Sequence, residues 1–368
     1  MTMPAPLGVA VVGCGTISDE YLRNLTAFPD LSVLYCADLD LGRAKKQAAA
    51  YGVPAAGTLA QALAHDGVEL VVNLTLPGAH AEVAAAAIAA GKHVWNEKPL
   101  TTDPATGRAL LRQAERAGVR VGCAPDTVLG AGLQTARRLI RDGAIGTPQT
   151  ALALMQSPGP ESWHHSPEFL FQPGAGPLFD LGPYYFSALA TVFGPASRVA
   201  AVGRQAAASR VIGSGPRAGT TFAVEVPTHV GALVEFTGGG AASLLFSFDS
   251  PLPRHGFVEI TGTEATMAVP DPNRFTGDIR IHRRGGDGWE TNKPAGASAG
   301  RGLGVLDMAR SLRAGQPHRA SGELALHVLE VMVAVETSLG GAAFEPVDSG
   351  FMVPPPLPED WDPYARTV

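Results

Sequence analysis

The pattern of apolar and polar positions divides the chain into two regions with different periodicities. In the first region, short apolar runs alternate with stretches in which apolar residues recur every three or four positions. The runs are typical of buried strands and the stretches of helices. This alternation predicts a doubly wound parallel sheet. Its expected strands are 7–13, 31–40, 69–76, 92–99 and 119–126, and its expected helices are 20–28, 59–66, 80–91 and 104–118.

The second region begins near residue 125 and changes to a period of two after one more helix, expected over 129–146. Strands are expected at 149–156, 198–205, 228–236, 241–248 and 257–263. The glycine-rich stretch TGGGAA joins two of them and predicts an antiparallel hairpin. Amphipathic helices are expected at 301–315 and 322–339. We therefore predict domains at 1–124 and 125–345 and a proline-rich tail at 346–368, which Trp361 and Tyr364 are expected to dock.

Composition excludes several classes of partner. The 368 residues are 45% hydrophobic and 17% charged, which suffices for two packed cores. The net charge of −6 and the lack of a basic stripe argue against nucleic acid or a membrane surface and favour a small molecule. The three cysteines have no metal-type spacing, no export signal is recognisable, and no run approaches the ~20 apolar residues of a membrane span. A reduced, cytoplasmic setting is expected.

A glycine-rich turn follows the first strand. Gly13 permits a tight turn, and Gly15 lets the backbone approach a pyrophosphate at the start of the next helix. Thr16 and Ile17 continue the turn ahead of the expected helix, and Ser18 stands where a third glycine or alanine is usual. The alternative is an ordinary strand–helix turn, but the context favours a dinucleotide site.

Asp38 lies about twenty residues beyond this turn, at the end of the second strand. A carboxylate there can accept hydrogen bonds from the adenosine ribose and repels a 2′-phosphate, which favours NAD over NADP. Arg43 lies close by in sequence and keeps NADP possible. The alternative role for Asp38 is that of a helix-capping acid.

Further candidate residues stand at the carboxyl ends of later strands, where ligands of such sheets bind. They are Thr75, Pro77, His80, Glu97 and Lys98. Lys98 directly follows a buried strand and precedes the stiff ring of Pro99, so a merely solvated charge is a poor explanation for it. His80 has a packing or capping role as its alternative.

At this point the chain resembles the glucose–fructose oxidoreductase, inositol dehydrogenase and rhizopine-catabolism (Gfo/Idh/MocA) family. The matching stretches are GVAVVGCGTIS, CADLD, AAIAAGKHVWNEKPL and GAGPLFDLGPYY. The resemblance implies a Rossmann domain followed by a domain with a large, open, mainly antiparallel sheet that serves oligomer contacts. It also implies that Lys98 and Asp180 belong to the catalytic cluster, with Tyr184 where many members have histidine.

The sequence around Asp180 and Tyr184 allows two interpretations. In a helix the two residues would share one face, one turn apart, although Pro183 would have to fall in the first turn or cause a kink. Alternatively, Asp180 caps the helix and Tyr184 is a core residue. Under the functional interpretation, the Lys98 ammonium favours the phenolate of Tyr184, which removes the proton of a substrate hydroxyl. Lys98 itself is the other candidate proton carrier.

The remaining candidates are expected to contact the substrate. Trp163, His164 and His165 lie in the loop before the Asp180 element, and Asp126 follows the sixth strand, where many members instead have asparagine and arginine. Two adjacent histidines without a carboxylate or cysteine at ligand spacing do not predict a metal site.

These observations predict an NAD(P)-dependent dehydrogenase that acts on a CH–OH carbon of a sugar, polyol or cyclitol. The partners expected are that substrate and further copies of the chain, as a homodimer or homotetramer through the second domain's sheet. The rival hypotheses are an NAD-dependent glycosidase that works by transient oxidation and elimination, and a non-catalytic NAD-binding regulator.

Overall fold

The computed structural model describes residues 5–341 and 343–367, which form two compact units. The first unit contains the stretch that ends at Gln134, the segment Ala295–Leu329 and the stretch that begins at Met352. The second contains Thr135–Pro294 and Glu330–Phe351. Each unit is therefore discontinuous in sequence. The domain boundaries expected at 124 and 345 remain a prediction.

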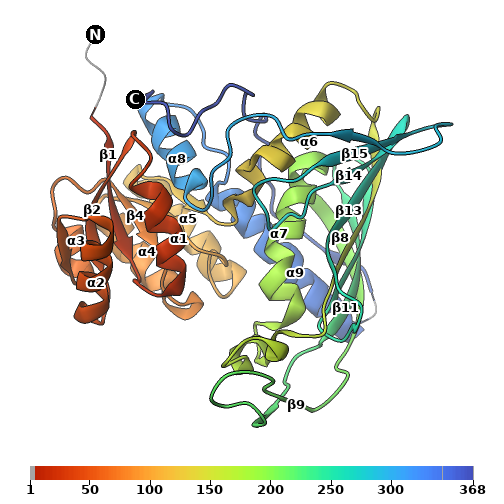
Figure 1. Cartoon of the computed structure of the whole chain (residues 1–368), viewed down its shortest axis with the longest axis horizontal. Helices are drawn as coiled ribbons and strands as arrows, with labels where there is room; N and C mark the ends of the chain where they lie inside the picture. Colours follow the sequence, from red (N-terminus) through yellow and green to blue (C-terminus); the bar gives the residue numbers. More distant parts are fainter. Residues whose placement is uncertain (1–4, 342, 368) are drawn as a thin grey trace. The chain divides into compact units, whose positions relative to one another are not determined.

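The first unit is built on a parallel sheet of six strands in the order β3-β2-β1-β4-β5-β6. The strands are β1 Leu7–Val12, β2 Leu31–Ala37, β3 Ala55–Gly57, β4 Leu70–Asn73, β5 His93–Asn96 and β6 Val121–Cys123. The helices are α1 Thr16–Leu25, α2 Leu41–Tyr51, α3 Leu59–Leu63, α4 His80–Ala89, α5 Pro104–Ala117 and α8 Leu303–Arg313. This is the predicted doubly wound sheet, with β1 at the centre between β2 and β4. Figure 1 shows these elements in red to orange, with α8 in blue.

The central strands of this sheet are fully buried. All six residues of β1 and all four of β4 are buried, as expected for parallel strands covered on both faces. Trp95 on β5 is fully buried, and its ring lies so close to Gly304 of α8 that a Cβ there would come within 1.9 Å of it. The glycine is thus needed for the helix to pack on the sheet.

The second unit holds a nine-stranded sheet in the order β16-β15-β14-β13-β7-β12-β11-β8-β17. Its strands are β7 Pro148–Gln156, β8 Ala196–Arg204, β11 His229–Phe236, β12 Ala241–Ser247, β13 Arg254–Gly262, β14 Ala265–Val269, β15 Ile279–Arg283, β16 Glu290–Asn292 and β17 Glu345–Pro346. A small second sheet pairs β9 Ser209–Val211 with β10 Thr221–Ala223. All neighbours in the large sheet are antiparallel except β7 and β12. The predicted hairpin is confirmed as β11–β12.

Helix α7, Gly176–Phe193, covers one face of this large sheet, as Figure 1 shows in green. It packs on β7, β11 and β12. The Phe193 ring stacks on Phe236 with centroids 4.9 Å apart, and Tyr185 meets Phe246 edge-on at 5.5 Å. This aromatic contact fixes the helix that carries two of the candidate catalytic residues.

Two helices run from one unit into the other: α6 Ala131–Arg141 and α9 Gly322–Gly341. By length and composition α9 could span a membrane, so the expectation that no segment approaches this limit was too strong. However, 61% of the apolar window is buried within the protein, and the helix carries Glu323, Glu330 and Glu336. These features are those of a core helix.

The proline-rich tail packs on the first unit. The Arg310 guanidinium lies 4.6 Å from the Trp361 ring centroid and donates to the carbonyls of Asp362 and Ala365. The ring of Tyr364 lies 5.8 Å from that of Phe28. Thus both aromatic residues singled out in the sequence contact the body of the protein.

Candidate dinucleotide site and catalytic residues

Gly13 occupies the tight turn after β1. Its φ is +93°, and its N–H donates to the carbonyl of Ala37 at 2.8 Å. A Cβ here would lie 2.7 Å from the backbone carbon of Leu74, so glycine is required both for the conformation and for space. The turn thus packs closely against the residues at the ends of β2 and β4.

Gly15 is the N-cap of α1, and no side chain caps this helix end. A Cβ on Gly15 would meet nothing within 4 Å, so the space in front of the helix is open. A helix N-terminus presents N–H groups and a partial positive charge, which together suit a phosphate. Thr16 is exposed beside this space, and Ile17 is partly exposed.

Ser18 supports the turn from behind. Its side chain is buried, donates to the carbonyl of Gly15 at 2.6 Å and accepts from the amide of Gln47 at 3.1 Å. The hydroxyl therefore holds the turn in place and ties α1 to α2. These two hydrogen bonds explain why serine occupies the position at which glycine or alanine is usual.

Asp38 is bonded to the same turn. One carboxylate oxygen accepts the N–H of Cys14 at 2.7 Å, and the other accepts the N–H of Asp40 at 2.8 Å. The capping role considered for Asp38 belongs instead to Asp40, whose carboxylate accepts from Gly42 and Arg43 at the start of α2. Asp38 is therefore held beside the glycine-rich turn that it stabilises.

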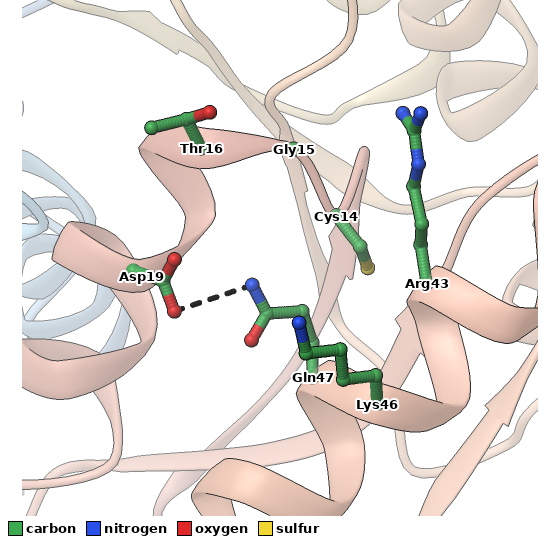
Figure 2. A pocket seen from close by; sticks show the side chains of 7 residues that line it. All are labelled: Cys14, Gly15, Thr16, Asp19, Arg43, Lys46 and Gln47. Carbon is green, nitrogen blue, oxygen red and sulfur yellow. Dashed lines mark hydrogen bonds between the residues drawn. The ribbon is translucent and has the colours of Figure 1, made fainter.

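A pocket of about 330 Å³ lies over this turn and is shown in Figure 2. It is lined by Cys14, Gly15, Thr16, Asp19, Arg43, Lys46 and Gln47. The basic side chains of Arg43 and Lys46 extend from α2 alongside the turn, and the Gln47 amide points toward Asp19. Lys46 and Gln47 were not predicted, although their spacing of three and four residues from Arg43 places them on the same helix face.

These residues fit a dinucleotide phosphate. The uncapped start of α1, the open space at Gly15 and two basic side chains provide a positive, accessible cradle at the carboxyl edge of a parallel sheet. Cys14 also lines this pocket, and it is buried, as are the other two free cysteines.

The ends of β4 and β5 are linked by a buried amide network. The Asn73 side chain donates to the side-chain oxygen of Asn96 at 2.9 Å and to the carbonyl of His80 at 3.1 Å. Thr75 donates its hydroxyl to Asn73 at 2.7 Å. Pro77 is exposed and begins a 3₁₀ turn, Pro77–Ala79, that leads into α4. The predicted edge at Thr75 and Pro77 is thus held by the Asn73 and Asn96 side chains, which were not among the predicted residues.

His80 is fully buried, and both ring nitrogens face backbone carbonyls: Nδ1 lies 2.7 Å from Pro99 and Nε2 lies 3.0 Å from Thr75. These contacts engage both polar atoms of the ring. The geometry supports a role in joining the two strand ends, whereas direct contact with the cofactor remains only a prediction.

Glu97 anchors the turn that carries Lys98. Its carboxylate accepts from the hydroxyl of Tyr21 at 2.9 Å and from the backbone N–H of Lys98 at 2.7 Å. Trp95 donates in turn to the Tyr21 hydroxyl at 3.4 Å. Because Glu97 is almost fully buried, its main effect is to fix the backbone at Lys98, which is partly exposed.

Asp180 and Tyr184 both lie on α7, one turn apart, as the helical interpretation predicted. The helix begins at Gly176 with Ala175 as its N-cap, so Asp180 is not a cap. Pro183 lies inside the helix rather than in its first turn. Asp180 is partly exposed and Tyr184 is 5% exposed.

The loop before α7 carries the three candidate residues Trp163, His164 and His165. The His164 ring meets Trp163 at 5.5 Å and Phe169 at 5.4 Å, both edge-on, and Trp163 is 66% exposed. His165 lies against Gly215. The loop is held by Arg210, which forms ion pairs with Glu161 and Asp249. A fixed, partly exposed aromatic surface results.

Asp126 is fully buried and holds the start of α8. One oxygen accepts the N–H groups of Gly302 at 2.7 Å and Gly304 at 3.2 Å. Burial raises the pKa of Asp126 to about 6, although the charge of Arg301 opposes the shift. This geometry gives Asp126 a structural task; contact with a substrate remains only a prediction.

In 5–341 and 343–367 no three His, Cys, Asp or Glu side chains are grouped to hold a metal ion.

Two family models match the chain. The oxidoreductase family with an NAD-binding Rossmann fold matches residues 7–124, and the Gfo/Idh/MocA C-terminal domain matches residues 133–268. The chain belongs to the Gfo/Idh/MocA family. It is an oxidoreductase whose first unit contains the NAD-binding domain, as the glycine-rich turn and its pocket indicated.

Similarity to individual proteins agrees with this assignment. Trans-1,2-dihydrobenzene-1,2-diol dehydrogenase of Mus musculus is 27% identical over 70% of this chain and 73% of its own length. Inositol 2-dehydrogenase 3 of Saccharopolyspora erythraea is 30% identical over 42% of this chain and 47% of its own length. The structure of an NAD-binding oxidoreductase from Klebsiella pneumoniae has a TM-score of 0.80 and 25% identity, covering 94% of this chain and all of that one.

Proposed function

We propose that this Gfo/Idh/MocA protein oxidises a secondary alcohol or hemiacetal carbon of a sugar, polyol or cyclitol. The observation that supports this most directly is the placement of Asp180 and Tyr184 one turn apart on α7. In the same chain, Glu97 anchors the backbone of Lys98 in the turn that follows β5. The diol and inositol dehydrogenases among its relatives are consistent with a hydroxylated substrate.

The proposed chemistry assigns one task to each residue. NAD, when bound, supplies the hydride acceptor. Tyr184 takes the hydroxyl proton as the C–H hydride leaves, so the alcohol becomes a carbonyl. Lys98 either assists Tyr184 in this step or carries the proton itself. Asp180 accepts a hydrogen bond from a substrate hydroxyl and orients the carbinol.

The cofactor is held through the turn at Gly13 and Gly15. We propose that NAD is preferred because Asp38 stands at the ribose position, and that Arg43 and Lys46 give NADP some affinity through its phosphate. The aromatic surface at Trp163, together with His164 and His165, is proposed to contact the substrate.

We further propose that the protein is a homo-oligomer. The face of the large sheet opposite α7 exposes Leu152 on β7, Val202 on β8 and Leu233 on β11, and apolar exposure gathered on one sheet face favours an interface between copies. We also propose that the protein is cytoplasmic, which cell fractionation would test.

The test is an absorbance assay for NADH formation over sugars, inositols and diols. A substrate should give NADH in proportion to the carbonyl formed. Lys98→Met should abolish turnover and keep NADH binding. Release of free sugar from glycosides without net NADH would instead indicate the glycosidase reaction, and a folded, NAD-binding protein inert to the whole panel would favour a regulator.

A further inference from the structure

The ring of His80 is enclosed between two acceptors. None of the residue is exposed, and its two nitrogens lie 2.7 Å and 3.0 Å from the carbonyl oxygens of Pro99 and Thr75. A carbonyl oxygen can only accept a hydrogen bond. A neutral imidazole has a single N–H, so it can satisfy one carbonyl and must turn a lone pair toward the other.

We propose that His80 is an imidazolium that donates to both carbonyls, and that this buried cation is a positioning residue for Lys98. Pro99 directly follows Lys98 in the turn after β5, and Thr75 lies just after β4. The His80 ring therefore links the segments that follow these two strands, on the side of the sheet where the cofactor is expected. The second half of this statement rests on the proposed function.

The two acceptors cannot easily move away from a neutral ring, because separate bonds hold them. Asn73 accepts from both the N–H and the hydroxyl of Thr75, at 3.3 Å and 2.7 Å. The side chain of Asn96 donates to the carbonyl of Leu100, next to Pro99, at 3.0 Å. Burying a cation is costly, and two carbonyl dipoles already held in place act against that cost, because a hydrogen bond is stronger in the low-dielectric interior.

The distances agree with this assignment. The 2.7 Å separation from Nδ1 lies in the range of charge-assisted N⁺–H···O bonds, and 3.0 Å from Nε2 is an ordinary N–H···O length. In the described part of the chain, neither nitrogen bonds a carboxylate. The titratable groups nearby are Glu82 on α4, Lys92 in the turn before β5, His93 on β5, and Glu97 and Lys98 in the turn after it. The packed helix α5 adds Arg108, Arg112, Glu115 and Arg116.

His93 on β5 provides an internal reference. Its Nδ1 accepts the N–H of Arg120 at 2.9 Å and therefore carries no proton. Burial lowers the pKa of His93, which also favours the neutral ring. We therefore expect one unprotonated ring nitrogen in His93 and none in His80.

The experiment is nitrogen NMR of the full chain labelled with ¹⁵N-histidine at pH 7.5, with His80→Gln identifying the His80 signals. His80→Asn serves for the assignment if that variant does not fold. We expect a bonded proton on both His80 nitrogens and a bare nitrogen in His93. A bare nitrogen in His80 overturns the proposal, whether or not the enzyme turns over any substrate.

Kinetics test the positioning role. With a substrate found in the NADH assay, His80→Gln should lower kcat by about 10²-fold, the effect of a misplaced catalytic group, while the Kd of NADH stays near the wild-type value. His93→Gln is the control and should keep kcat. An unchanged kcat in His80→Gln overturns the positioning role; the proposed function would still stand, because the wild-type enzyme turns over.

Discussion

The carboxylate of Asp38 accepts the backbone N–H of Cys14 at 2.7 Å, so the end of β2 holds the glycine-rich turn directly. Asp38→Ala should weaken NADH binding by about tenfold, because an N–H deprived of its acceptor costs roughly 1–3 kcal/mol and loosens the turn. Asp38→Asn keeps an oxygen for this bond and should lose less. Fluorescence titration with NADH measures both.

Asp40→Ala is the matched control, because Asp40 caps α2 two residues away. It should lower the stability by about 1 kcal/mol and leave NADH affinity unchanged. Equal losses of affinity in the two alanine variants would show that the bond to Cys14 has no special importance.

Arg43 and Lys46 are expected to determine how well NADP is tolerated, since both line the pocket beside the turn. The double change Arg43→Ala, Lys46→Ala should weaken NADPH binding by about tenfold or more, in line with charged hydrogen bonds to phosphate, and affect NADH much less. Lys45→Ala, on the same helix but outside the pocket lining, should change neither. A parallel loss for both cofactors would contradict a phosphate role.

Tyr184→Phe should reduce kcat/KM by about 10²–10⁴-fold, because it removes the proposed general base without changing the shape of the ring. NADH affinity should stay the same. Tyr185→Phe is the neighbouring control: its hydroxyl accepts from Gly256 at 2.9 Å, and burial raises its pKa, so its role is structural. Comparable activity in the two variants would remove Tyr184 from the mechanism.

Asp126 makes stability depend on pH. Its folded pKa of about 6 lies above the unfolded 3.8, so its favourable contribution is complete below about pH 4 and is lost as pH rises through 6. Asp126→Asn removes this titration. Relative to wild type it should gain up to roughly 3 kcal/mol between pH 4 and pH 7.5. Urea unfolding across this range measures the difference, and a flat difference would show that Asp126 does not titrate there.

The sheet face opposite α7 is expected to bury Val202 and Leu233 between copies of the chain. Val202→Asp and Leu233→Asp place a charge in that contact and should lower the molar mass found by light scattering. Leu252→Asp changes an exposed leucine in the turn after β12 and should not. A monomeric wild-type protein would exclude the interface outright.

The sequence predicted those features whose cause is local. Gly13 needs a positive φ, the buried runs of β1 and β4 need a parallel sheet, and Asp180 and Tyr184 share a face as soon as the helix is assumed. The helix α2 and the three-residue strand β3 were missed, since α2 is rich in alanine and β3 is too short to show a period.

Features that depend on distant parts of the chain could not be predicted. Asp126 is explained by Gly302 and Gly304, and Glu97 by Tyr21, partners far away in sequence. His80 stood at the predicted edge, but its contacts with the carbonyls of Thr75 and Pro99 depend on the conformation of two turns, which the sequence pattern does not show. A single sequence shows the polar residue and does not show what surrounds it.

The unit with the glycine-rich turn is assembled from three stretches of chain, and Asp30 illustrates how closely they are joined: it binds Arg310 from the second stretch and Thr367 from the third. A fragment cut after residue 124 would leave that carboxylate buried without its guanidinium. The unit with the glycine-rich turn therefore cannot be exchanged between relatives as one continuous segment. A chimaera has to carry all three stretches together.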